Sequence, residues 1–416
     1  MRTHITPTGW WSGIIAAVVC AGLVLAAPAQ TASALVAHQV DNAHGGRGTL
    51  LSSTPLGAES TTQITEDLRA RQFAFDPSQV RSSAHAYRLT YRTVDAAGRP
   101  TTASGLFVLP DTGNRNPQVI TYLHGTMAGK DEAPSVATGS DRTAAFLFSS
   151  AGYATVAPDY VGLGTGPGLH PYLDVADATD ASVDMLEAAR TAGNRLGRQL
   201  RQNVLVTGFS QGAVVAMGLG RALQAGATPG LRLAAVAPIS GPYHLQNAEI
   251  PAAFTISQLD KADATYYVAY LLTAWQRVYR IYDNPAEVFQ APYDKTVPPL
   301  YDGQHDERAI FPNLPATPQQ LLTPAYLRQI EHPTGRLLAA LRANDNTCSD
   351  WRPRVPVRFF FADGDEQVAP ANTTQCRQDF TARGVPTTVV DVGGVGHSES
   401  ARRAASQVLT WFRQQH

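Results

Sequence analysis

Residues 204–215 read Val204-Leu205-Val206-Thr207-Gly208-Phe209-Ser210-Gln211-Gly212-Ala213-Val214-Val215. The segment begins as a short apolar run typical of a buried strand, passes through the pattern Gly-x-Ser-x-Gly, and continues with helical periodicity. A sharp turn between a strand and a helix would project the hydroxyl of Ser210, while glycine at 208 and 212 removes side chains that would collide where the two backbones meet. The segment therefore predicts an exposed serine nucleophile; the alternative is a plain tight turn.

Short apolar runs of the kind buried in a parallel sheet recur along the chain, at residues 119–123, 153–157, 204–207, 233–239, 357–361 and 388–392. Helical periodicity separates most of them, at residues 178–200, 213–224, 372–383 and 401–413. Upstream, residues 87–94 and 101–109 alternate apolar and polar positions around Asp95-Ala96-Ala97-Gly98, which predicts an antiparallel hairpin. Together these patterns predict an α/β fold, with a mostly parallel sheet covered by helices on both faces.

One connection is much longer than the single helix that a crossover between parallel strands needs. It runs from Gly241 to the strand near Val355 and contains helical periodicity at 264–282 and 336–343. The first of these helices carries six aromatic residues, Tyr266, Tyr267, Tyr270, Trp275, Tyr279 and Tyr282. We expect an inserted, mostly helical cap at residues 242–351, which divides the α/β domain into residues 35–241 and 352–416.

A serine nucleophile needs a base, and the base needs an acid that orients it. Of eleven histidines, His397 follows a late strand on a glycine-rich loop, where its imidazole can reach over the edge of the sheet. The alternative for His397 is a surface histidine. The loop after residues 358–361 offers Asp363 and Asp365, and both qualify by position. An Asp-x-Asp pair can also bind calcium, but no EF-hand spacing follows it, so we expect no metal.

Two backbone N–H groups should stabilise the oxyanion that forms when a serine attacks a carbonyl. One is the amide that follows the nucleophile, on Gln211. The other should come from the loop His124-Gly125-Thr126, directly after the strand at 119–123. We assign it to Thr126, with Met127 as the alternative.

Other features of the chain exclude whole classes of function. With 33 basic and 34 acidic residues the net charge is -1, so no long-range field attracts nucleic acid. The glycine-rich segment 162–168 resembles a dinucleotide fingerprint, but Pro167 replaces the last glycine and no helix is predicted to begin there. We therefore expect no nucleotide cofactor. Asp159 lies at the end of a strand and is expected to anchor a loop.

The N-terminal segment has the composition of an export signal. Residues 14–27 are apolar without interruption and lead into small-residue sites at 27–29 and 32–34. We predict a signal peptide at residues 1–34 and a secreted protein; an uncleaved membrane anchor is the alternative, because about 20 apolar residues can span a bilayer. Cleavage would leave Cys348 and Cys376 as a pair in an oxidising compartment, where we expect a disulfide rather than two buried thiols.

Together, these residues resemble the α/β-hydrolase superfamily, and more closely its secreted lipase and esterase branch, the secretory lipase type. The likeness spans residues 85–416, and its marks are His124-Gly125-Thr126, residues 159–164, His170-Pro171-Tyr172, Gly208 to Gly212, residues 346–353, Asp365 with Val368 and Pro370, and Gly396-His397. In the family pattern an acid precedes valine by three residues, which selects Asp365 over Asp363. Family members usually have Val-Pro there, and in this chain Ala369 intervenes. The resemblance implies a long cap over an acyl pocket and hydrolysis of carboxylic esters without a cofactor.

The sequence therefore predicts a secreted serine hydrolase, a lipase or esterase that acts through an acyl-enzyme. Ser210 would attack the ester, His397 would transfer the proton, and Asp365 would orient His397. The expected partner is a small-molecule or lipid ester, with transient contact at a lipid interface if the helix at 264–282 opens as a lid.

Three alternatives remain open. An exported serine peptidase or an acyltransferase can use the same triad, because fold and triad do not decide the leaving group. A peptidase would need an acid in the cap to hold a substrate amine, for which Glu249, Asp260 and Asp263 are candidates. A non-catalytic binding protein is the third alternative, but it would be expected to have lost a member of the triad.

Overall fold

The computed structural model describes residues 46–254 and 259–415. The predicted signal peptide at residues 1–34 lies outside these residues. Among the helices of the described part of the chain, none has both the length and the apolar character that crossing a membrane would require.

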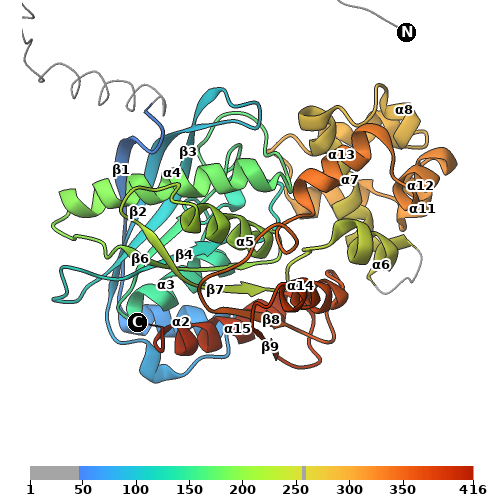
Figure 1. The fold of residues 1–416 in the computed structure, drawn as a ribbon. Coiled ribbons are helices and arrows are strands. Elements are labelled where there is room, and N and C mark those ends of the chain that lie inside the picture. Colours follow the sequence, from blue (N-terminus) through green and yellow to red (C-terminus); the bar gives the residue numbers. More distant parts are fainter. Residues whose placement is uncertain (1–45, 255–258, 416) are drawn as a thin grey trace, which may run out of the picture. The chain divides into compact units, whose positions relative to one another are not determined.

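The strands of the described residues form one nine-stranded sheet, in the order β1-β2-β3-β5-β4-β6-β7-β8-β9 (Figure 1). From β5 to β9 every pair is parallel, while β1, β2, β3 and β5 pair antiparallel. The strands are β1 (Leu50–Glu59), β2 (Ala84–Val94), β3 (Pro100–Pro110), β4 (Val119–Leu123), β5 (Ala154–Pro158), β6 (Asn203–Phe209), β7 (Arg232–Ile239), β8 (Val357–Phe361) and β9 (Thr387–Asp391). This confirms the predicted mostly parallel α/β sheet.

Two apolar cores lie on opposite faces of the sheet, because successive residues of a strand point to opposite sides. In β4, Val119 and Leu123 belong to one core, and Ile120 and Tyr122 belong to the other. The first core is covered by α4 (Val175–Arg195), α5 (Gln211–Gln224) and α14 (Ala371–Ala382). The second is covered by α2 (Thr61–Ala70), α3 (Ser140–Ser150) and α15 (His397–Phe412) (Figure 1).

Some element boundaries differ from the sequence-based expectation. The helix expected at 178–200 is α4, which ends at Arg195 because Gly197 adopts a φ of 71°, a conformation that terminates helices. The helix expected at 401–413 is α15, which begins at His397, so His397 lies in the first helical turn and not on the loop. Strand β1 was not expected, since most of its residues are exposed and Pro55 and Gly57 interrupt it at a register shift.

The described residues of the segment 242–351, here called the cap, fold mainly into helices. The bounds are η3 (Leu245–Glu249), α6 (Ile250–Phe254), α7 (Lys261–Tyr279), α8 (Pro285–Val288), α9 (Tyr293–Thr296), η4 (Pro298–Leu300), α10 (Glu307–Ile310), η5 (Phe311–Asn313), α11 (Pro318–Leu321), α12 (Pro324–Glu331) and α13 (Gly335–Asn344). Several aromatic residues of α7, including Tyr266, Tyr270 and Trp275, are buried in one apolar cluster that also contains Tyr172 and Leu173. These aromatic side chains therefore pack the cap on the α/β domain.

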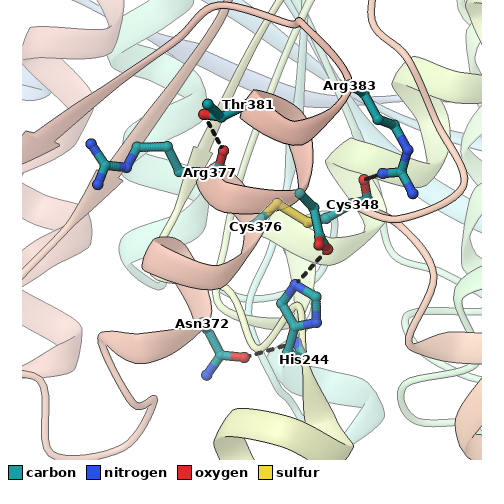
Figure 2. The surroundings of a disulfide bond; sticks show 8 residues. His244, Cys348, Asn372, Cys376, Arg377, Thr381 and Arg383 are labelled. Atoms are coloured by element: carbon teal, nitrogen blue, oxygen red, sulfur yellow. Dashed lines mark hydrogen bonds and ion pairs between the residues drawn. A yellow bond between two sulfur atoms is a disulfide. The ribbon is translucent and has the colours of Figure 1, made fainter.

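Both ends of the cap are attached to α14. At its start, the backbone N–H of His244 donates to Asn372 Oδ1 over 2.8 Å, as Figure 2 shows. At its end, Cys348 is joined to Cys376 by a disulfide, with 5.2 Å between the two Cα atoms (Figure 2). Arg383 Nη1 donates to the Cys348 carbonyl over 2.8 Å. One helix of the α/β domain thus holds both connections to the cap.

Replacing both cysteines, in the variant Cys348→Ser/Cys376→Ser, should lower the free energy of unfolding. Chain-entropy arguments for a loop of this length give about 3 to 4 kcal/mol. Denaturant unfolding with and without reductant measures the effect. The wild type should lose stability on reduction and the double variant should not respond; a wild-type midpoint that ignores reductant would contradict the disulfide's role.

Asp177 is a second feature that affects stability. It lies in α4, is 3% exposed, and neither carboxylate oxygen has a hydrogen-bond partner among the described residues. Burial, together with Asp174 and Asp180, raises the pKa of Asp177 to about 8. The carboxyl group is therefore protonated in the folded protein at neutral pH but ionised in the unfolded chain, so its contribution to stability is lost as the pH rises from about 4 to about 8.

We expect Asp177→Asn to stabilise the protein at alkaline pH, because asparagine stays neutral in both states. The gain should be about 2 kcal/mol or more at pH 8 and should vanish toward pH 4. Urea unfolding of the variant and the wild type across this range measures it. Asp67→Asn, at an exposed position of α2, serves as the control and should show no such pH-dependent gain.

Candidate active site

Ser210 lies at the turn between β6 and α5, with a φ of 55° and a ψ of -122°. A positive φ is rare for a residue with a side chain and is held only where the surroundings enforce it. The Ser210 backbone N–H donates to the carbonyl of Ile239 over 2.9 Å, which ties the turn to the end of β7. Ser210 is only 5% exposed and not freely exposed as the sequence predicted, since residues of the segment 242–351 line the pocket around it.

Glycine is required on both sides of this turn. A Cβ atom at Gly208 would overlap the carbonyl of Gly212, and one at Gly212 would overlap the carbonyl of Leu123 at the end of β4. The start of α5 therefore packs directly on the backbone of two strands. This close approach leaves the Ser210 side chain as the group that points away from the turn.

His397 is paired with Asp365. The distance from His397 Nδ1 to Asp365 Oδ2 is 2.8 Å, and both side chains are buried. Asp365 Oδ1 accepts the backbone N–H groups of Gln367 at 3.0 Å and Val368 at 2.9 Å, which fix the orientation of the carboxylate. Asp363, the other candidate, is exposed.

The pairing determines which ring nitrogen of His397 can act as a base. A carboxylate only accepts hydrogen bonds, so Nδ1 carries the proton and Nε2 has the free lone pair. Nε2 is buried and has no hydrogen-bond partner among the described residues. His397 and Ser210 line the same pocket, and the ring of Phe209 lies 4.6 Å from the imidazole.

The two predicted oxyanion residues also lie beside Ser210. Gln211 is the first residue of α5, and a Cβ atom at Gly125 would lie 3.6 Å from Ser210 Cβ, which brings the loop at 124–126 against the nucleophile. The backbone N–H groups of Thr126 and Gln211 donate to no backbone carbonyl of the described residues. Met127, the alternative donor, accepts a hydrogen bond at its carbonyl from Tyr270 Oη over 3.1 Å.

The segment His170-Pro171-Tyr172 contacts both predicted oxyanion residues, Gln211 and Thr126. His170 Nδ1 donates to the Val161 carbonyl over 3.0 Å, so Nε2 accepts from Gln211 Nε2 over 2.8 Å. Burial lowers the pKa of His170 to about 4 and keeps the ring neutral. Thr126 Oγ1 donates to Tyr172 Oη over 3.1 Å. Sequence reasoning quoted this tripeptide but assigned it no role, because its partners are distant in the chain.

Two pockets meet at Ser210. The first has a cavity volume of about 70 Å³ and is mainly apolar. Its walls come from the α/β domain and the cap and include Tyr172, Leu173, Leu245, Ile250, Phe254, Val268 and Leu271. The second is larger and more polar, and it also contains His397, Thr126 and several carboxyl groups. Tyr267 and Gln367 line both pockets and are joined by a hydrogen bond of 2.6 Å from Tyr267 Oη to Gln367 Oε1.

The three acidic residues of the cap that were candidates for holding an amine lie in three different surroundings. Asp263 lines the second pocket. Glu249 lines the apolar pocket and accepts from the Ala369 N–H over 3.2 Å; burial raises its pKa to about 8. Asp260 caps α7 by accepting from the Ala262 N–H over 2.8 Å, and it lines neither pocket.

Asp159 anchors a loop, as expected from its position. Its carboxylate is fully buried and accepts from Ser104 Oγ over 2.6 Å and from the Ser135 N–H over 3.0 Å. These bonds hold the loop after β4 to the end of β5.

No protein-family model matches the chain, and no curated protein matches it in sequence. Solved structures do match. A Legionella pneumophila protein has a TM-score of 0.80 and 26% identity, covering 88% of this chain and 97% of that one. The rice cell wall degrading esterase LipA from Xanthomonas oryzae has a TM-score of 0.75 and 26% identity, covering 89% and 100%. Candida antarctica lipase A has a TM-score of 0.61 at 15% identity, covering 84% and 78%, and shares the fold.

The chain belongs to the α/β-hydrolase superfamily. In this α/β-hydrolase the strand order brings β4, β6 and β7 together in the middle of the sheet. The loop at 124–126 follows β4 and Ser210 follows β6, while Asp365 follows β8 and His397 follows β9. Side chains after parallel strands meet at one edge of the sheet, which is why residues far apart in the chain form one site.

Replacing the glycine after the nucleophile tests the close packing of the turn. Gly212→Ala should destabilise this α/β-hydrolase by about 3 kcal/mol or more, because its Cβ atom would overlap the Leu123 carbonyl. Gly113→Ala is the matched control, since nothing lies within 4 Å of a Cβ atom there. Thermal and denaturant unfolding of both variants measure the difference; equal stability of the two would refute the packing argument.

Proposed function

We propose that this α/β-hydrolase is an exported lipase or esterase that cleaves carboxylic esters through a serine acyl-enzyme. The observation that carries the proposal is the buried pair of His397 Nδ1 and Asp365 Oδ2 at 2.8 Å. It leaves the lone pair of Nε2 available, and His397 lines the same pocket as Ser210; both facts support the role of His397 as the base for a serine nucleophile.

In the proposed mechanism, Ser210 Oγ attacks the ester carbonyl while His397 Nε2 takes its proton. The buried carboxylate of Asp365 stabilises the imidazolium that forms. The N–H groups of Gln211 and Thr126 hold the oxyanion, and the N-terminus of α5 adds a favourable dipole. His397 then returns the proton to the leaving alcohol, and water cleaves the acyl-enzyme by the same steps.

The two pockets suggest how an ester would bind. The apolar pocket, with walls from Leu245, Ile250 and Leu271, suits the acyl chain because burying apolar groups there is favourable. The second pocket, which contains His397, suits the alcohol, since the leaving oxygen must be reached by Nε2. Tyr267 and Gln367 line both pockets and are joined by a hydrogen bond, so they would lie between the acyl half and the alcohol half of the bound ester.

Other observations favour an exported ester hydrolase. Two of the similar structures are, by their names, an esterase and a lipase. The disulfide between Cys348 and Cys376 is typical of proteins outside the cytoplasm, which agrees with the predicted signal peptide at 1–34.

One observation favours a serine peptidase instead. Asp263 lines the second pocket, where a peptidase would use an acid to hold the amine of its substrate. Parallel assays of ester, amide and acyl-transfer substrates separate these activities.

Replacing the nucleophile is the direct test. Ser210→Ala should reduce the hydrolysis of p-nitrophenyl butyrate by at least about 1000-fold, because no other group can form the acyl-enzyme. A fluorophosphonate should add to Ser210 alone, as measured by mass spectrometry of the peptides. Ser52→Ala, on an exposed part of β1, is the control and should behave as the wild type. Unchanged turnover by Ser210→Ala would end the proposal.

The two aspartates of one loop provide a matched pair. Asp365→Asn should lower kcat by about 1000-fold or more, since an amide favours the wrong tautomer of His397. Asp363→Asn should retain the wild-type kcat, because that side chain is exposed and does not contact His397. Steady-state kinetics of both variants measure this, and equal loss in the two would exclude Asp365 as the orienting acid.

A further inference from the structure

The second pocket beside Ser210 is strongly acidic. It is lined by six carboxyl groups and one guanidinium, those of Asp131, Glu132, Asp141, Asp263, Asp306, Glu307 and Arg402. Three of the acids belong to the α/β domain and three to the cap, so the carboxyl groups face the pocket from two sides. So many acidic groups beside a nucleophile would attract a positively charged substrate and repel a negatively charged one.

These carboxyl groups lack partners of opposite charge. Among the described residues, Asp141 accepts from Tyr122 Oη over 2.7 Å, Glu132 accepts from the Gly129 N–H over 2.8 Å, and Asp306 accepts from the Ala309 N–H over 3.0 Å. None of the six acids forms an ion pair in this part of the chain, and neither does Arg402. Burial, followed by repulsion from Glu132, raises the pKa of Glu307 to about 7. Burial and the neighbouring Asp260 raise the pKa of Asp263 to about 6. A cation in the pocket would relieve this repulsion.

A second observation concerns a polar group in the lining of the same pocket. His397 lines it, is 2% exposed, and has its Nε2 atom buried without a hydrogen-bond partner among the described residues. A polar atom buried in this way is costly unless a ligand completes its hydrogen bonding. The acidic groups therefore line the pocket of the proposed catalytic base; Asp131 is exposed and the other five are partly buried.

Aromatic side chains line the same pocket, namely Phe73, Tyr122, Phe209 and Tyr267. The faces of aromatic rings attract ammonium groups, and carboxylates attract them further. A neutral polyol would instead need paired donors and acceptors, whereas at pH 8 the carboxyl groups of Glu307 and Asp263 are mostly ionised and only accept. Rings and carboxylates together fit an ammonium group best.

We infer that the second pocket binds a cationic alcohol, so that the preferred substrates are esters of an apolar acid with an amino or quaternary ammonium alcohol. The inference rests on the proposed ester hydrolysis and adds the chemistry of the leaving group. Glu307 and Asp263, both in the cap, are the residues that select the cation.

The test compares two esters of equal shape that differ in charge. Butyrylcholine carries a quaternary nitrogen where 3,3-dimethylbutyl butyrate carries a carbon atom. At pH 8, where both cap carboxyl groups are mostly ionised, kcat/KM should be about tenfold or more higher for the cationic ester. Glu307→Gln and Asp263→Asn should each lower this ratio by about threefold or more.

Measuring both esters on one sample makes the ratio independent of the fraction of folded enzyme. Glu331→Gln, exposed on α12 and away from the pocket, is the matched control and should keep the wild-type ratio. A wild-type ratio of one or below would overturn the inference, and so would a ratio that neither variant changes. A preference for a glucose ester over both substrates would also overturn it, in favour of a neutral polyol.

If no ester is hydrolysed, the proposed function fails and the pocket is tested by binding alone. Calorimetric titration of tetramethylammonium into Ser210→Ala should then give a Kd that Glu307→Gln raises severalfold. Absence of binding would overturn the inference independently of the reaction.

Discussion

The active site depends on the contact between the backbone of α5 and the end of β4. At Gly212 there is no room for a side chain, because the carbonyl of Leu123 occupies that space. The contact accompanies the strained conformation of Ser210, and a Cβ atom at Gly125 would already be in van der Waals contact with the Ser210 side chain. Close packing of the main chain thus places Ser210 next to the loop that carries one of the proposed oxyanion amides.

The α/β domain and the cap contribute different parts of the proposed site. The α/β domain supplies Ser210, Asp365 and His397, while the cap supplies most of the wall of the apolar pocket and a smaller part of the second pocket. The cap is tied at both ends to α14, by the hydrogen bond from His244 to Asn372 and by the disulfide. The helix α14 also follows directly after the loop that carries Asp365. The position of α14 therefore affects both the position of the cap and that of Asp365.

The sequence predicted those features that depend on residues close together in the chain. Hydrophobic periodicity indicated the strands, and the steric demands of the backbone indicated the Gly-x-Ser-x-Gly turn. The redox chemistry of the expected compartment indicated the disulfide. Position alone left Asp363 and Asp365 equivalent, and only the family pattern separated them; the structure adds that Asp365 accepts two backbone N–H groups. Nothing in the sequence indicated that Glu307 in the short helix α10 lies in the same pocket as Asp131, since their meeting depends on how the cap packs. The role of His170 was hidden for the same reason, because its partner Gln211 is distant in the chain.

The position of Tyr172 has a consequence for how substrate range can change. Its ring forms part of the apolar pocket, and its hydroxyl receives the hydrogen bond of Thr126. Changing Tyr172 would therefore remove a hydrogen bond from the residue that carries a proposed oxyanion amide. Ile250, Ala253 and Leu271 line the same pocket but belong to the cap. Substitution of these cap residues offers evolution and enzyme engineers a way to alter chain-length preference while that hydrogen bond is kept.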